Sequence, residues 1–130
     1  MFSSLKSSPQ LYQTLETQCL VDQAKPLGLV VMLYDGAIRS IHEARAAMQR
    51  GDRKAKGHAI SKALRIIEEG LRASLDHGVG EMSKNLGDLY IYINSRLLSA
   101  HLRDDEAALA EALDLLRPLR DAWQAIEKSH

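Results

Sequence analysis

Residues 26–50 read PLGLVVMLYDGAIRSIHEARAAMQR, and the spacing of their apolar side chains predicts the fold class. Apolar residues recur three or four positions apart, which is the spacing of one face of an α-helix. Pro26 stands where a first-turn proline is tolerated, and Gly51 follows the stretch as a stop signal. The stretch is therefore predicted to form one long helix. Its core-facing positions are Leu27, Val30, Val31, Tyr34, Ala37, Ile38, Ile41, Ala44 and Met48.

Three further segments of about 23 residues show the same spacing. They cover residues 53–75, 81–103 and 105–127. Glycines mark the turns before the first two segments, and Asp104 is expected to cap the third. A short turn cannot cross the ~35 Å length of such a helix, so consecutive helices must run antiparallel. The prediction is an all-α, antiparallel up-down-up-down four-helix bundle over residues 26–127, preceded by an N-terminal arm over residues 1–25.

Two details of the bundle follow from helical angles. Pro118 falls on the outward side of the last helix, where it bends the helix without ending it, because the apolar stripe continues beyond it. Tyr90 and Tyr92 point in nearly opposite directions, so one of them is expected to be exposed.

Composition excludes several classes of protein. The 130 residues suit one domain, and 17 basic residues balance 17 acidic ones, which argues against a nucleic-acid partner. Cys19 is the only cysteine, so neither an internal disulfide nor a thiolate zinc site can form. The sequence contains no apolar run long enough for membrane insertion. A cytoplasmic protein with no metal, cofactor or catalytic residue is expected.

One enzyme-like alternative rests on His58. An exposed histidine on a four-helix bundle is the arrangement of a histidine phosphotransfer domain, and Lys62 lies one turn further along the same helix. The spacing is one residue longer than in the phosphotransfer motif. A solvated surface histidine is therefore the favoured interpretation.

The predicted helices carry more apolar residues than an arc of about 100° per helix requires. These extra positions are Leu29, Met32, Leu33, Ile60, Leu64, Ile91, Leu98 and Leu102. Either the N-terminal arm or a second subunit covers them, or they line grooves for an amphipathic segment of another protein. A structural dimer and a binding module are both consistent with this pattern.

Several ordered blocks resemble the flagellar export chaperone FliS family over about residues 10–127. The first is Met32-Leu33-Tyr34-Asp35-Gly36-Ala37, which reproduces a family signature. Further blocks are Gly51-Asp52, Leu89-Tyr90-Ile91-Tyr92 and Asp121-Ala122-Trp123. The chain departs from the family at Lys25, Ile91 and Pro118, and Ile91 replaces a position that is often acidic.

The resemblance implies a cytoplasmic chaperone that binds the disordered C-terminal segment of flagellin. Such a chaperone prevents premature filament assembly and supports delivery to the export gate, with export-gate components and other flagellar proteins as further partners. Tyr12 matches the tyrosine of the family's N-terminal arm, so the resemblance adds it to the expected partner-binding residues.

Overall fold

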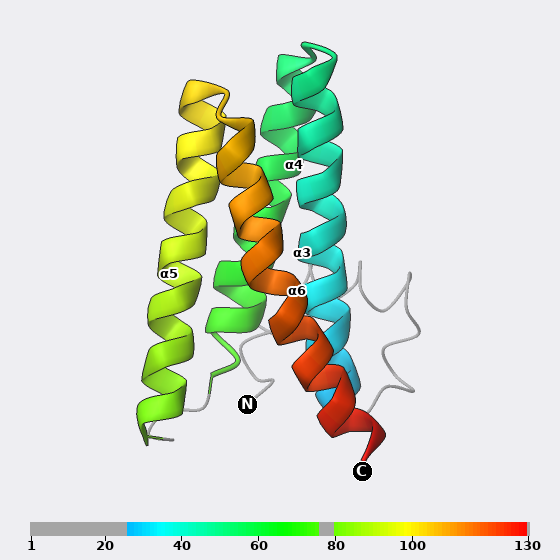
Figure 1. Cartoon of the computed structure of the whole chain (residues 1–130), viewed down its shortest axis with the longest axis vertical. Coiled ribbons are helices and arrows are strands. Elements are labelled where there is room, and N and C mark those ends of the chain that lie inside the picture. Colours follow the sequence, from blue (N-terminus) through cyan, green and yellow to red (C-terminus); the bar gives the residue numbers. More distant parts are fainter. Residues whose placement is uncertain (1–25, 76–79, 130) are drawn as a thin grey trace.

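The computed structural model of this chain describes residues 26–75 and 80–129. Its helices are α3 (Pro26–Gln49), α4 (Arg53–Arg65), the π-helix η2 (Ile66–Arg72), α5 (Gly80–Arg103) and α6 (Glu106–Lys128). Consecutive helices run antiparallel around one core, counting α4 and η2 as one (Figure 1). The predicted all-α four-helix bundle is confirmed. The predicted arm, residues 1–25, lies outside the described residues.

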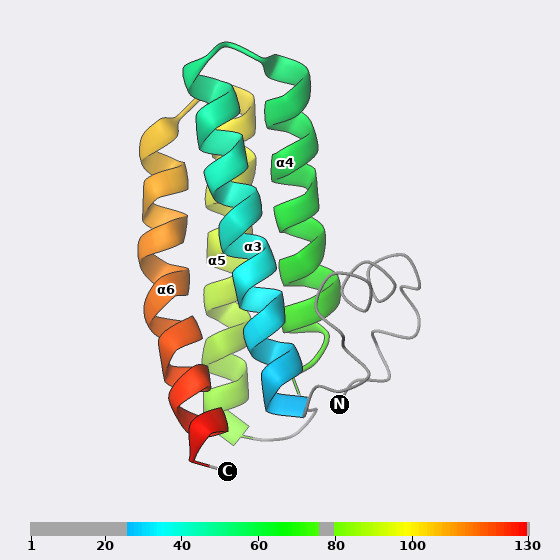
Figure 2. The ribbon, with the colours of Figure 1, turned by 90° about the vertical axis from the view of Figure 1, so that its right-hand side faces the viewer.

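The four helices occupy the corners of the bundle, with α3 diagonally opposite α5 (Figures 1 and 2). Helix α3 packs against α4 and η2 on one side and against α6 on the other. Helix α5 packs in the same way, against α4 and η2 on one side and against α6 on the other. Each helix therefore has two neighbours, and this arrangement buries a wider arc of every helix than a single contact would.

An aspartate caps the N-terminus of both α4 and α6. Asp52 accepts a hydrogen bond from the Ala55 amide at 3.0 Å, and Asp105 accepts one from the Ala108 amide at 3.2 Å. The prediction that Asp104 caps the last helix is wrong by one residue. Asp104 adopts a φ of 51°, in the left-handed turn conformation, and its carboxylate pairs with Lys56 instead.

The helix predicted over residues 53–75 forms without a break from Arg53 to Arg72, but its second half is the π-helix η2 and not an α-helix. The Ala73 amide donates to the Glu68 carbonyl, five residues back, at 3.2 Å. Four residues of η2 are buried in the core: Ile66, Ile67, Gly70 and Leu71.

Buried tyrosines join two diagonal helices at the centre of the bundle. The hydroxyls of Tyr34 on α3 and Tyr90 on α5 are hydrogen bonded, with ring centroids 6.4 Å apart. Burial raises the pKa of both phenols. The expectation of one exposed tyrosine is confirmed by Tyr92, and Pro118 is exposed within a continuous α6, as predicted.

Candidate functional site

Three of the predicted partner-binding residues belong to the core. Leu29, Leu33 and Ile60 are all buried, and Leu33 has no exposed surface at all. The prediction that these side chains lie outside the core is wrong, because α3 and α4 each pack between two neighbours and use a wider arc than one contact needs. Gly70 shows how closely η2 covers Leu33: a Cβ at Gly70 would lie 2.8 Å from Leu33 Cδ2.

The other predicted residues retain accessible surface. Met32 and Leu64 are half-buried against the core, whereas Ile91, Leu98 and Leu102 expose 48%, 49% and 71% of their surface. Tyr12 lies outside the described residues. Met32 is on α3, diagonally opposite α5, so the structure does not bring all of these residues into one site.

The accessible residues that do come together lie along the junction of α4 and α5. A Cβ at Gly57 would lie 3.2 Å from His101 Cε1, and Asn94 Nδ2 donates to Glu68 Oε2 at 3.4 Å. Leu64 is seven residues after Gly57, which places it on the same side of α4. Leu64, Ile91, Leu98 and Leu102 therefore form one apolar strip, called the α4–α5 surface below.

Asn94 contributes an unusual polar group to this junction. Its amide nitrogen points to Glu68, because a carboxylate can only accept a hydrogen bond. The amide oxygen then faces away, and among the described residues it is a buried acceptor without a donor. An unpaired buried acceptor is destabilising, so Asn94 is a weak point of this junction.

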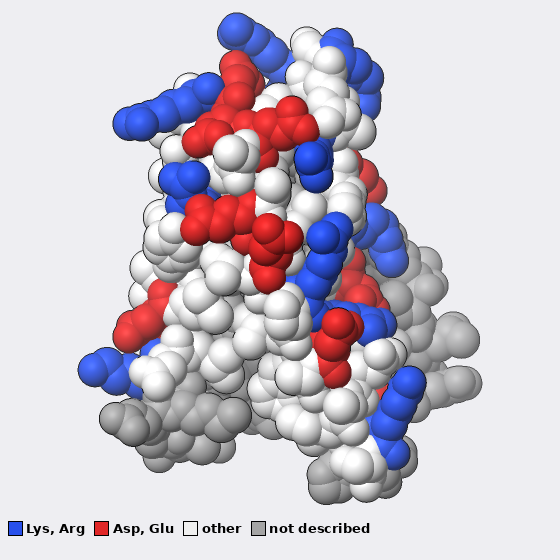
Figure 3. All heavy atoms as spheres, viewed as in Figure 1, with Lys and Arg blue, Asp and Glu red and all other residues white. Residues whose placement is uncertain are grey.

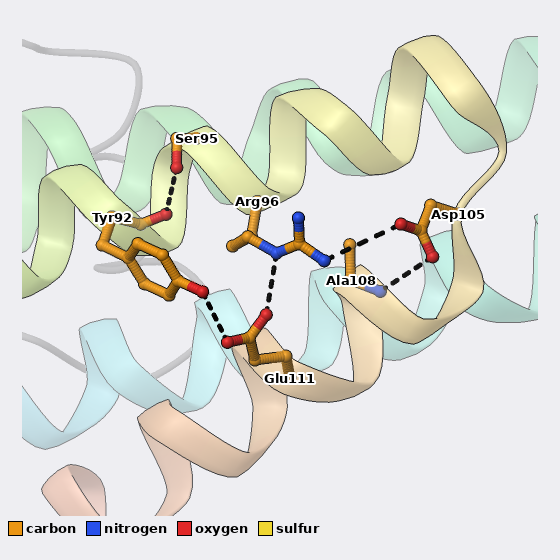
Figure 4. A network of polar contacts seen from close by, with 6 residues as sticks. All are labelled: Tyr92, Ser95, Arg96, Asp105, Ala108 and Glu111. Atoms are coloured by element: carbon orange, nitrogen blue, oxygen red, sulfur yellow. Dashed lines mark hydrogen bonds and ion pairs between the residues drawn. The ribbon is translucent and has the colours of Figure 1, made fainter.

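The neighbouring face of the molecule, over α5 and α6, is dominated by paired carboxylates. Figure 3 shows acidic side chains gathered over the upper half of this face. In Figure 4, Arg96 Nε donates to Glu111 Oε1 at 2.7 Å and the Tyr92 hydroxyl donates to Glu111 Oε2 at 2.6 Å. The Tyr92 hydrogen bond, followed by Arg96, lowers the pKa of Glu111. This face is therefore held together by satisfied polar contacts.

A pocket of about 440 Å³ opens where the two turns at one end of the bundle meet. Its lining residues are Met48, Gly51, Asp52, Arg53, Lys56, Asp104 and Glu106. Buried Lys56 pairs with Asp104 and donates to the His101 carbonyl at 3.1 Å, and Glu106 accepts from Arg45 at 2.8 Å. The Lys56 contacts join the two turns. Lys56 therefore has a structural role that the sequence did not predict.

The described ranges 26–75 and 80–129 give little support to a metal site or to histidine chemistry. No group of histidine, cysteine or carboxylate side chains there could hold a metal ion. His58 is exposed on α4, as expected of a solvated histidine. No helix in that part of the chain is long and apolar enough to cross a membrane.

Comparison with known proteins identifies the family. The sequence model of the family described as "Flagellar protein FliS" matches residues 8–130. The flagellar secretion chaperone FliS of Salmonella typhimurium is 41% identical over 121 residues, which cover 92% of this chain and 90% of the relative. The Escherichia coli and Bacillus subtilis proteins of that name are 40% and 36% identical, each covering 88% of this chain and 85% of the relative. The family is one of chaperones and not of enzymes, which removes the phosphotransfer alternative for His58. The chain belongs to the FliS family of flagellar secretion chaperones.

Proposed function

We propose that this chain is a cytoplasmic chaperone that holds the disordered C-terminal segment of flagellin until export. The observation that carries the proposal is the row of exposed side chains on α5, Ile91, Leu98 and Leu102, in a chain of this family. The client segment becomes helical as it lays an apolar face on the α4–α5 surface. Occupying a segment that is needed for polymerisation blocks premature assembly, and no covalent chemistry is required.

The size of the exposed row sets a requirement on the client. Covering the accessible parts of the three side chains contributes about 3–4 kcal/mol in total. Coupled folding of a disordered segment costs about 2–5 kcal/mol, so this row alone does not give a stable complex. The client must therefore extend over further surface, and half-buried Met32 on α3 marks one place where it can do so. A segment that wraps around the bundle meets this requirement.

Co-purification with flagellin tests the proposal. Intact flagellin is expected to form a 1:1 complex with this chain, and flagellin lacking its C-terminal segment is expected to form none. The isolated C-terminal peptide should gain helical circular dichroism in the mixture beyond the sum of the two components. Equal binding of both flagellins would reject the C-terminal segment as the client. A tight self-dimer that binds neither would instead favour a structural role.

A further inference from the structure

Helix α6 is attached to the bundle unequally along its length. Its first half contributes five side chains that are fully or almost fully buried: Ala108, Leu109, Ala112, Leu113 and Leu116. From there to Ser129, where the described part of the chain ends, no residue is buried. Leu119 and Trp123 pack against the core only in part. We call residues 119–128, the part of α6 beyond Pro118, the strap.

The strap also has fewer neighbouring helices than the first half of α6. The first half contacts both adjacent helices, since Glu106 accepts from Arg45 of α3 and Glu111 accepts from Arg96 of α5. The strap lies against α3, because a Cβ at Gly28 would lie 3.4 Å from Glu127 Oε2. Figure 1 shows its C-terminal end well apart from the start of α5. One neighbouring helix covers a narrower arc than two, which explains the partial burial.

Pro118 separates the strap from the first half of α6. Proline has no amide hydrogen, so the Asp114 carbonyl lacks the hydrogen bond that residue 118 donates in a regular helix. The link between the two halves is therefore weakest at this residue. The strap is also shorter than the about 12–15 residues that an isolated helix needs in water. A strap that leaves α3 must therefore unwind.

An ion pair holds the strap to α3. Arg120 Nε donates to Asp35 Oδ1 at 2.8 Å, and Arg120 Nη2 donates to Asp35 Oδ2 at 3.4 Å. The Arg120 side chain exposes 25% of its surface, so the pair is partly shielded from water. A guanidinium that holds both carboxylate oxygens is better oriented than an ordinary surface pair. With few buried apolar contacts nearby, this pair is a main attachment of the strap.

We propose that the strap is a conformational device, which detaches from α3 and unwinds as one unit while the rest of the bundle stays folded. Pro118 is the hinge, and the pair of Asp35 with Arg120 is the latch. Detachment exposes the apolar side chains of Leu119 and Trp123 without unfolding the core. The inference is independent of the proposed function, because it concerns only contacts within this chain.

Unwinding as a unit differs from the ordinary fraying of a helix end. Fraying loosens a helix turn by turn, so the protection of backbone amides against hydrogen exchange falls steadily toward the terminus. A strap that opens in one step exposes its amides together, so their protection factors agree. Native-state hydrogen exchange followed by NMR therefore separates the two cases.

In the wild type, the amides of residues 121–125 are expected to have protection factors within about threefold of one another. These factors should lie at least about tenfold below those of residues 110–116, which are held by the buried half of α6. A steady decline from residue 119 to residue 128 would overturn the inference. Protection of residues 121–125 equal to that of residues 110–116 would overturn it as well.

Two variants test the hinge and the latch. Pro118→Ala restores the hydrogen bond to the Asp114 carbonyl and is expected to raise the protection of residues 121–125 at least about tenfold. Arg120→Gln removes the latch and is expected to lower that protection about tenfold.

The matched control is Arg96→Gln, which removes the same charge from a comparable pair. Arg96 lies 2.7 Å from Glu111 and exposes 29% of its side chain, but its pair holds the first half of α6. This variant is expected to change the protection of residues 121–125 less than about twofold. An equal loss in Arg96→Gln and Arg120→Gln, or unchanged protection in Pro118→Ala, would overturn the inference. Circular dichroism confirms that each variant is folded, and the wild-type exchange pattern is decisive even if a variant is not.

Discussion

Leu33 and Gly70 provide a test of how α3 packs against η2. Leu33 is fully buried, and its two methyl carbons lie 2.8 and 3.3 Å from where a Cβ at Gly70 would stand. Truncation of Leu33 to alanine removes buried methyl groups and leaves a cavity, so Leu33→Ala is expected to cost about 3–4 kcal/mol of unfolding free energy. Gly70→Ala forces the Leu33 side chain to move, which costs about 1–3 kcal/mol, partly offset by about 1 kcal/mol of helix propensity.

The double variant Leu33→Ala/Gly70→Ala is the informative one. The methyl group of the new alanine at position 70 enters the space that Leu33 vacates, so the double variant should be more stable than the sum of the two single changes predicts, by about 1–2 kcal/mol. Urea unfolding followed by circular dichroism measures all three, and an unchanged m-value keeps the comparison valid. Leu98→Ala serves as the control, since Leu98 is half-exposed and should cost less than about 1 kcal/mol. Strict additivity, or a cost for Leu33→Ala no greater than that of Leu98→Ala, would refute the packing described here.

Three further predictions concern buried polar groups and charge. Tyr34→Phe leaves the Tyr90 hydroxyl buried without its partner and should cost about 1–3 kcal/mol, whereas Tyr34→Phe/Tyr90→Phe should cost less than that single change in urea unfolding. Asn94→Leu removes a buried unpaired acceptor and should leave the melting temperature unchanged or raise it; a clear fall would contradict the assignment. Hydrogen bonds lower the pKa of Glu106 and Glu111, so both carboxylates contribute to folding stability above the ordinary carboxyl range near about pH 4. This contribution is lost as the pH falls below that range, and melting temperatures measured across it should fall toward acid.

Local patterns were sufficient to predict the bundle. The spacing of apolar residues over 26–50 marks one helix, and the glycine turn at residue 51 marks its end. Short turns then require antiparallel neighbours, so architecture followed from features that lie close together in the sequence. The exposure of Pro118 followed in the same way, from its angle on a single helix.

The site was predicted less well, because it depends on contacts between helices. Leu33 and Leu98 look alike in sequence, since each lies off the inner stripe of its helix, but η2 covers Leu33 and nothing among the described residues covers Leu98 to the same extent. The π-helix itself has no signature in local spacing.

The central claim is that the flagellin C-terminal segment binds on the α4–α5 surface, and calorimetric titration of the peptide into matched variants tests it most directly. Leu98→Glu and Leu102→Glu place a charge within the apolar strip, whereas Ile126→Glu places one at an exposed apolar residue of α6. The wild type is expected to bind the peptide with 1:1 stoichiometry, Leu98→Glu and Leu102→Glu each to bind at least about tenfold more weakly, and Ile126→Glu to stay within about twofold of the wild type. Wild-type affinity in both Leu98→Glu and Leu102→Glu, with both proteins folded, would contradict the claim and place the client elsewhere on the bundle.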